Sequence, residues 1–261
     1  MADEVDGLQV EDHPGVLRLV LDRPDRMNAL TDAMTDGLAD HLERAQGRAG
    51  LRAVVISGNG PGFCAGADIG GEAAIDRFDV RALDRANRMV RGVVALDVPV
   101  NAAVHGAAAG VGCSLALACD LVVAAERATF LLPFTSIGLM PDGGATATVA
   151  ASIGRARAMR MALLGEPLHA HDAYAAGLVS HLVADEDAVR LTVETVLSWL
   201  LMGPPLAYAA TKRAVNAATL GHLETALERE RTGQTVLLRT ADAAEGMRAF
   251  TERRRPTYEG E

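Results

Sequence analysis

The sequence has few aromatic residues, few cysteines and a deficit of positive charge. Aromatic side chains make up 3% of the 261 residues, so there is little with which to stack nucleic-acid bases. The formal net charge of −9 would repel a phosphate backbone. Cys64, Cys113 and Cys119 form an odd set without C-x-x-C spacing, which argues against a disulfide framework or a zinc knuckle. We therefore expect no nucleic-acid partner and no metal, and a reducing, cytoplasmic location.

Targeting and membrane-spanning patterns are also missing. The acidic N-terminus has neither the basic region nor the apolar region of a signal peptide. The longest uncharged run, Val98 to Cys119, is interrupted by a proline, an asparagine, a histidine and several glycines, and is interpreted as a buried strand, a turn and a helix. With 49% apolar and 23% charged residues, we expect a folded chain with a full core and no membrane partner.

Strands, glycine-rich turns and helices alternate over the first part of the chain. The expected strands are Leu8–Glu11, Val16–Leu21, Leu51–Ser57, Val98–His105, Asp120–Ala124 and Ala128–Leu132. The expected helices follow Thr31 as N-cap, cover roughly Glu72–Leu96, with Ile75 and Phe78 on the apolar stripe, and run from the Gly106–Gly112 turn through Ala118. This alternation predicts an α/β fold with mostly parallel strands and a ligand crevice beyond their carboxyl ends.

The C-terminal part is expected to be helical. The predicted helices are Asp185–Met202, a helix from Pro205 to about Ala218, His222–Arg239 and Ala241–Arg254. We divide the chain into a core at residues 1–200 and a helical region at 201–261 that packs on its own core or on a neighbouring subunit.

Several further motifs are incomplete. Gly58-Asn59-Gly60-Pro61-Gly62 follows a strand, but its third glycine is misplaced for a dinucleotide fingerprint, and no P-loop occurs. His169 and His171 lack an evident third metal ligand. Ser114 lies in a half-match to a nucleophile elbow, and Asp142 and then His169, His171 or His181 follow in hydrolase order, but the final glycine of that motif is missing.

Four segments together carry a stronger signal. They are Arg23–Leu30 (RPDRMNAL), Gly62–Ile69 (GFCAGADI), Ala103–Gly106 leading to Cys119-Asp120, and Gly138–Gly144 (GLMPDGG). In this order and spacing they resemble the crotonase family of enoyl-CoA hydratases and isomerases, and the resemblance covers almost the whole chain. It implies a crotonase-like ββα spiral core with a helical C-terminal oligomerisation region, a homotrimer or a dimer of trimers, and an acyl-CoA substrate. No separate cofactor is implied, because coenzyme A is part of the substrate.

The resemblance also implies roles for particular residues. The backbone amides of Ala67 and Val111 match the oxyanion hole that binds the thioester carbonyl. Arg26, Ala29 and Leu30 match the segment that lines the nucleotide and pantetheine side, while Ala65, Asp68 and Ile69 match the loop around the adenine. Phe250 and Arg253 match a C-terminal helix that covers coenzyme A in relatives; a solvated helix end is the alternative for Arg253.

The chain departs from the hydratase pattern at the two catalytic glutamates. Ser114 and Phe134 stand at the matching positions, and neither can act as a carboxylate base. Asp142 remains, in a position where some isomerase relatives carry an aspartate. We expect Phe134, Leu139 and Met140 to form an apolar pocket that raises the pKa of Asp142. The alternative is that Asp142 caps a helix over Ala145–Ser152.

Isomerase-type proton transfer is therefore the expected chemistry, with Asp142 as acid and base. Three alternatives stay open: water addition to a 2-enoyl-CoA with Asp142 or Ser114 positioning the water, acyl-CoA binding without turnover, and ester hydrolysis through Ser114.

Overall fold

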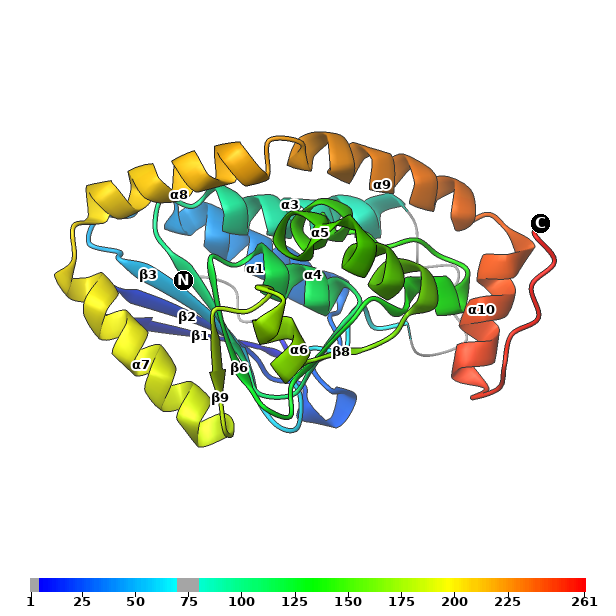
Figure 1. The fold of residues 1–261 in the computed structure, drawn as a ribbon, viewed down its shortest axis with the longest axis horizontal. Helices are drawn as coiled ribbons and strands as arrows, with labels where there is room; N and C mark the ends of the chain where they lie inside the picture. The colour runs from blue at the N-terminus through cyan, green and yellow to red at the C-terminus, as the bar shows by residue number, and fades with distance from the viewer. Residues whose placement is uncertain (1–4, 70–79) are drawn as a thin grey trace.

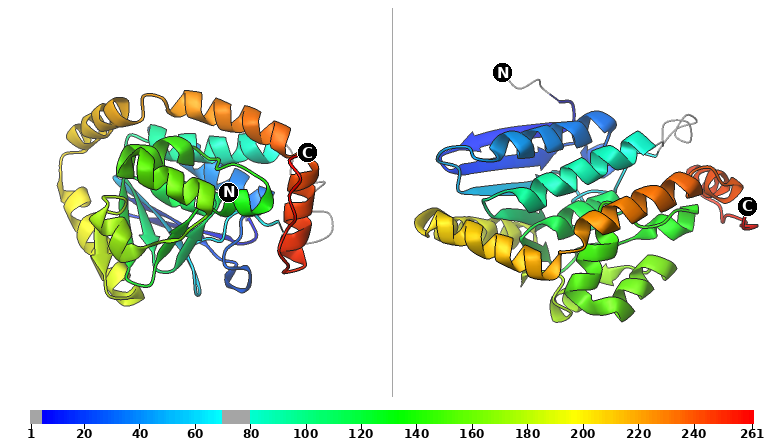
Figure 2. Two further views of the ribbon diagram at one scale, coloured as in Figure 1. Left: turned by 45° about the vertical axis from the view of Figure 1, so that its right-hand side comes forward. Right: turned by 90° about the horizontal axis from the view of Figure 1, so that it is seen from above.

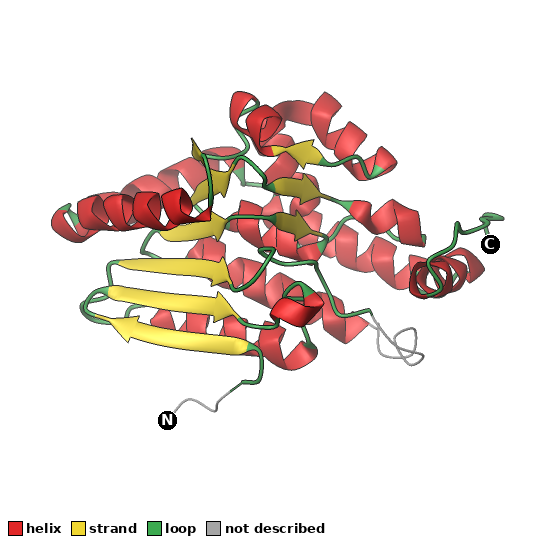
Figure 3. Ribbon diagram, turned by 90° about the horizontal axis from the view of Figure 1, so that it is seen from below, coloured by secondary structure: helices red, strands yellow, loops and turns green. Residues whose placement is uncertain are grey.

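The computed structural model describes residues 5–69 and 80–261 as a layered α/β structure with helices on both faces of a sheet (Figures 1 and 3). Across the larger sheet the described strands are β1 Leu8–His13, β2 Val16–Leu21, β3 Ala53–Gly58, β4 Val100–Val104, β6 Leu121–Ala125 and β9 His181–Val183. Only the β1–β2 hairpin is antiparallel among these pairs. A smaller sheet holds β5 Ala107–Ala109, β7 Thr129–Leu131 and β8 Leu168–His169. The expected mostly parallel α/β architecture is confirmed.

Strand alternation divides the buried side chains between two cores. On β3, Val54 and Ile56 face the core under the helical layer, whereas Ala53 and Val55 face the core under the helix α7. The views in Figure 2 place the two layers on opposite faces of the sheet. Because both faces of these strands are covered, their sequences read as continuous apolar runs.

Most helices lie where the periodicity predicted them. Their bounds are α1 Asp32–Ala45, α3 Val80–Ala95, α4 Val111–Ala118, α5 Ala145–Leu164, α6 Ala170–Ala175, α7 Glu186–Met202, α8 Pro205–Thr219, α9 Leu223–Leu237 and α10 Ala241–Thr251, with short 3-10 turns η1 Pro24–Arg26 and η2 Pro133–Ile137. Thr31 caps α1 as expected, because its Oγ1 accepts from the Met34 amide at 3.1 Å. Residues 72–79 of the expected second helix, with Ile75 and Phe78, lie outside the described residues.

The Gly106–Gly112 segment is not a simple turn, because it contains the strand β5. Three consecutive alanines have little intrinsic preference for a strand. They form one because β5 pairs with β7 and forms a bridge from Ala108 to Cys64. Tertiary pairing therefore decided a local structure that the residue types did not indicate.

The C-terminal helices lie against the core of their own chain. In Figure 1, α8 and α9 arch over the helical layer and α10 descends beside η2. The helix α9 packs on α3 and α5, which brings it behind the loop that carries Asp142. None of the helices in the two described ranges is long and apolar enough to cross a membrane.

Candidate active site

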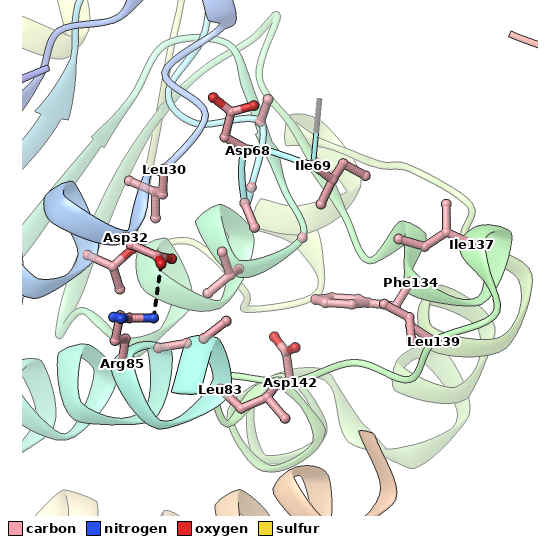
Figure 4. Close-up of a pocket in the computed structure, with 18 of the residues that line it drawn as sticks. Leu30, Asp32, Asp68, Ile69, Leu83, Arg85, Phe134, Ile137, Leu139 and Asp142 are labelled. Carbon is pink, nitrogen blue, oxygen red and sulfur yellow. Dashed lines mark ion pairs between the residues drawn. The ribbon is translucent and has the colours of Figure 1, made fainter. Parts of the chain in front are cut away.

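A cavity of about 140 Å³ lies beyond the carboxyl ends of the parallel strands (Figure 4). Its walls come from α3, the loop after β3, the N-terminus of α4 and the η2 segment. Nine of the residues singled out from the sequence line it: Leu30, Ala65, Ala67, Asp68, Ile69, Val111, Phe134, Leu139 and Asp142. The crevice is therefore where the strand order predicted it.

Two glycine turns form one wall of this cavity. Gly66 has φ +100° and Gly110 has φ +54° with ψ −134°, conformations that favour glycine. A Cβ on Gly66 would lie 3.0 Å from the Ala109 carbonyl oxygen, so the two turns touch through their backbones. Parallel bridges from Leu30 to Ala67 and from Cys64 to Ala108 hold the first turn in register.

The amides of Ala67 and Val111 emerge from these turns. Across the described residues, neither amide donates to a protein acceptor. The Val111 amide is also at the N-terminus of α4, where the helix dipole favours negative charge. Two unpaired backbone donors beside one cavity can together bind an oxygen that gains negative charge.

Asp142 lies in the opposite wall, and Figure 4 shows its carboxylate pointing into the cavity below Phe134. It is 5% exposed. Its Oδ2 accepts from Gln234 Nε2 at 3.0 Å, whereas Oδ1 is buried and has no hydrogen-bond partner among the described residues. Burial raises the pKa of Asp142 to about 7 against the hydrogen bond from Gln234, which lowers it, and the nearby Glu230 charge adds to the rise. The expected direction of this pKa shift is confirmed.

The alternative role of Asp142 as a helix cap is wrong. The N-cap of α5 is Gly144, and the carboxylate that binds the start of this helix is Glu230 of α9. Glu230 accepts from the Gly144 amide at 2.7 Å and from the Thr146 amide at 2.9 Å. Asp142 is thus left without a capping function, and one of its oxygens faces the cavity.

Ser114 and Met140 do not line the cavity. Ser114 is fully buried and its Oγ donates to the Asp142 carbonyl oxygen at 2.7 Å, a contact that positions the loop. Met140 is bound through its backbone to Gln234. Leu139 and Phe134 therefore line the cavity as expected, whereas the prediction that Met140 lines it is wrong.

The hydrolase arrangement is not assembled. Within the described ranges, no histidine hydrogen-bonds to Ser114, and His169 and His171 are exposed on β8 and α6. No group of three His, Cys, Asp or Glu side chains in these ranges could hold a metal. All three cysteines are buried free thiols, and burial raises the pKa of Cys64 and Cys113 to about 12. These groups offer no second nucleophile.

The residues matched to coenzyme A contacts are only partly gathered. Arg26 is exposed on η1, while Arg23 binds the Ala29 carbonyl oxygen at 2.6 Å and pairs with Asp68 at 2.9 Å. Arg23, which the sequence reasoning missed, thus ties the Ala29–Leu30 segment to the Ala65–Ile69 loop, and residues of both segments line the cavity. Phe250 and Arg253 are exposed at the end of α10 and do not line the cavity.

Gln234 and Glu230 were also missed. Both are buried on α9, on the same stripe as Leu223 and Leu227. Spacings of four, three and four residues mark one helix face. Two polar residues at apolar stripe positions were the signal that could have revealed them.

Comparison with known proteins identifies the family of this chain. The sequence pattern of a family described as enoyl-CoA hydratase/isomerase matches residues 11–261. A probable enoyl-CoA hydratase of Rhodobacter capsulatus is 40% identical over 97% of this chain and 98% of its own length. A 1,2-epoxyphenylacetyl-CoA isomerase of Escherichia coli is 36% identical over 94% of this chain and 95% of its own. The crystal structure of an enoyl-CoA hydratase from Mycobacterium avium subsp. paratuberculosis superposes with a TM-score of 0.91 at 48% identity, covering 98% of this chain and all of that one. The chain belongs to the enoyl-CoA hydratase/isomerase family, within the crotonase superfamily, and is an enzyme of that family.

Proposed function

We propose that the protein is an isomerase that moves the double bond of an enoyl-CoA thioester, with Asp142 as its single acid and base. The observation that carries the proposal is the pairing of one buried, unpartnered carboxylate oxygen with two unpartnered amides around one cavity. An unpaired buried polar atom costs free energy, so its retention at this place favours a role in chemistry.

The reaction balances with these groups alone. On a 3-enoyl-CoA, Asp142 Oδ1 takes a proton from C2, and the electron pair moves onto the thioester oxygen to give a dienolate. The amides of Ala67 and Val111 bind that oxygen while it is negative. The protonated Asp142 then returns the proton to C4, the double bond forms between C2 and C3, and the carboxylate is regenerated. A pKa of about 7 suits a group that must both accept and donate a proton near neutral pH.

The surroundings of Asp142 favour proton transfer over water addition. Phe134 occupies one of the positions matched to a hydratase glutamate and places an apolar ring beside the carboxylate (Figure 4). Ser114, at the other, is turned away toward the Asp142 carbonyl oxygen. No second carboxylate lines the cavity near Asp142 to activate water; the other lining aspartates of the described residues, Asp32 and Asp68, pair with arginines.

Coenzyme A is expected to bind along the mouth formed by the Ala29–Leu30 and Ala65–Ile69 segments, with Arg26 and Arg253 near its phosphates and Phe250 against its nucleotide. We further propose a cytoplasmic homotrimer or dimer of trimers. The exposed apolar side chains Trp199, Met202 and Leu206 on α7 and α8 support an interface. Light scattering after gel filtration tests the assembly.

The decisive experiment incubates the purified protein with a 3-enoyl-CoA in D₂O and follows the product by mass spectrometry. Asp142→Asn is compared with wild type, and Asp172→Asn, at an exposed position of α6, serves as the control. We expect double-bond migration without gain of water, lost in Asp142→Asn by about 10²- to 10⁴-fold and kept in the control. Deuterium enters the product in those turnovers in which the proton on Asp142 exchanges with solvent before it is returned to C4. Because one relative is a 1,2-epoxyphenylacetyl-CoA isomerase, that ester is the second substrate tested.

Other outcomes separate the alternatives. Addition of water to a 2-enoyl-CoA, seen as a gain of 18 mass units in a parallel incubation in ordinary water, would favour a hydratase, a name that two of the relatives described above carry. Binding of the esters without exchange or turnover would indicate a catalytically impaired acyl-CoA-binding protein. Exchange that survives Asp142→Asn would remove Asp142 from the mechanism.

A further inference from the structure

A glutamine on a distant helix makes the one hydrogen bond that the Asp142 carboxylate receives from the described residues. Gln234 lies on α9, is fully buried, and reaches the loop that carries Asp142 from 92 residues downstream. Its Nε2 donates to Asp142 Oδ2 at 3.0 Å and to the Met140 carbonyl oxygen at 2.9 Å. Its Oε1 accepts from the Met140 amide at 3.0 Å.

The backbone of Met140 fixes which way this amide faces. A backbone N–H can only donate, so the Gln234 atom that receives it must be the oxygen. The Nε2 group is then the one that meets Asp142, and its two hydrogens are both used. Flipping the amide would set N–H against N–H and carbonyl against carboxylate. Gln234 therefore presents a donor, and only a donor, to Asp142.

We propose that Gln234 is the positioning residue of the acid/base: it holds Oδ2 of Asp142 and so leaves Oδ1 as the oxygen that exchanges the proton with substrate. The proton exchange with substrate rests on the proposed isomerase function. The effect of Gln234 on the titration of Asp142 does not depend on that function. A donor on Oδ2 fixes the rotation of the carboxylate, which Figure 4 shows pointing into the cavity, and leaves Oδ1 without a hydrogen-bond partner among the described residues.

Few other charges act on Asp142. On α9, Glu230 raises its pKa, while its own carboxylate is held by Gly144 and Thr146. Neither α4 nor η2 carries a charged residue. On α3, Arg85 lines the same cavity but pairs with Asp32 and Asp36. The donor from Gln234 is thus the principal contact that favours the ionised form.

The test compares two substitutions of Gln234. Gln234→Leu removes the donor, so the carboxylate loses stabilisation and its pKa rises. Gln234→Glu keeps the acceptor for the Met140 amide but places a second carboxyl at Oδ2, and two carboxyls that share a site have one strongly raised pKa. Thr235→Val is the control, because Thr235 is the next residue of α9 and its hydroxyl donates only to the Arg231 carbonyl oxygen.

Two readouts are measured. The first is the infrared carbonyl band of the protonated Asp142 carboxyl, assigned by difference from Asp142→Asn and titrated without substrate. The second is the pH profile of kcat/KM. We expect the midpoint to rise by about one unit in Gln234→Leu, which lowers kcat/KM about tenfold on the acid side, and to rise further in Gln234→Glu, with Thr235→Val unchanged.

The outcomes are distinct. An unchanged infrared midpoint in both variants overturns the inference, whether or not the protein isomerises anything, and so does a uniform loss of kcat/KM with no shift in its pH profile. A raised midpoint in a protein without isomerase activity supports the Gln234–Asp142 coupling and removes the proposed function instead. If Gln234→Leu does not fold, Gln234→Glu alone decides through the same titration.

Discussion

The two walls of the candidate active site are built in different ways. One wall is main chain: the amides of Ala67 and Val111 are placed by turns that follow β3 and β5. The other wall is a side chain, Asp142, held by residues of α9. At positions 67 and 111 the first wall tolerates changes of side chain, because any residue but proline supplies an amide. The second wall depends on the identity of Asp142, Gln234 and Glu230, which come from two distant segments. Substitutions in the second wall are therefore expected to change the type of reaction.

The two walls also differ in what they do to stability. The amide wall leaves two backbone donors without a protein acceptor among the described residues, whereas the Asp142 wall buries an acid whose charged form has one donor among them. In the first wall the positive φ angles fall on Gly66 and Gly110, which adopt them without strain, whereas in the second wall burial of the carboxylate charge is electrostatically unfavourable. Each difference predicts a separate response to substitution and to pH.

The largest expected effect is a pH-dependent gain of stability in Asp142→Asn. The pKa of Asp142 is raised from 3.8 to about 7 in the folded protein. Between these values the unfolded chain binds fewer protons than the folded one, so the free energy of unfolding falls as pH rises and levels off above pH 7. Asn does not ionise, so we expect Asp142→Asn to exceed wild type by up to about 4 kcal/mol at pH 8. The two should be equal near pH 4.

Urea unfolding of both proteins at pH 4 and pH 8 measures this difference. Burial also raises the pKa of Glu230, but Glu230 is present in both proteins, so its contribution to the difference in unfolding free energy largely cancels. Asp172→Asn serves as the control for changing an exposed aspartate. A difference between the two unfolding free energies that is the same at both pH values would show that folding does not raise the pKa of Asp142.

Gly110→Ala should damage the main-chain wall far more than Val111→Ala. Gly110 has φ +54° and ψ −134°, a conformation that strains an alanine by about 1–3 kcal/mol. Relief of that strain would displace the Val111 amide, and loss of one such donor typically lowers kcat by about 10²- to 10³-fold. Val111→Ala keeps the amide, so kcat should stay within a few-fold of wild type. Deuterium exchange into the acyl-CoA ester measures both, and equal losses would mean that the Val111 side chain matters as much as its amide.

Glu230→Gln should move the pH profile opposite to the Gln234 variants. Removing the Glu230 charge lowers the pKa of Asp142, so the acid side of the kcat/KM profile shifts to lower pH, by about a few tenths of a unit. The side-chain amide of Gln has one oxygen and so cannot accept from both the Gly144 and the Thr146 amides as Glu230 does. The free energy of unfolding should therefore fall by about 1–3 kcal/mol. The pH profile and thermal unfolding are measured together. A shift to higher pH would show that Glu230 acts through structure and not through charge.

Much of the first wall could be predicted from sequence, and much of the second could not. The GFCAGADI segment and the small-residue turn before α4 are local motifs that carry the family resemblance. Through that resemblance Ala67 and Val111 were matched to an oxyanion hole, and both line the cavity. Asp142 was also located, and its raised pKa follows from its apolar neighbours.

The contacts of Asp142 were beyond sequence reasoning, because they join segments that are far apart along the chain. Gln234 and Glu230 lie in a helix expected only to pack on the core or on a neighbour, and no local pattern says which loop faces that helix. Met140 was misplaced for the same reason: its distance from Asp142 along the chain is two residues, but its backbone is bound by α9 on the far side of the loop.

The smallest expected effect is that of Ser114→Ala, and it separates the proton-transfer enzyme from a serine hydrolase. Ser114 Oγ donates to the Asp142 carbonyl oxygen, so its loss should cost about 1 kcal/mol of stability. It should lower isomerisation by less than about tenfold, since the Asp142 backbone is still held through the α9 contacts to its neighbours. Ser152→Ala, which removes a hydroxyl-to-carbonyl bond at an exposed position within α5, is the control for loss of a serine hydroxyl away from the cavity. Release of free coenzyme A is followed in parallel, because a nucleophilic Ser114 would lose that hydrolysis by several orders of magnitude without any change in thermal unfolding. Such a selective loss would place the chemistry on α4 and reduce Asp142 to a neighbour of the reacting group.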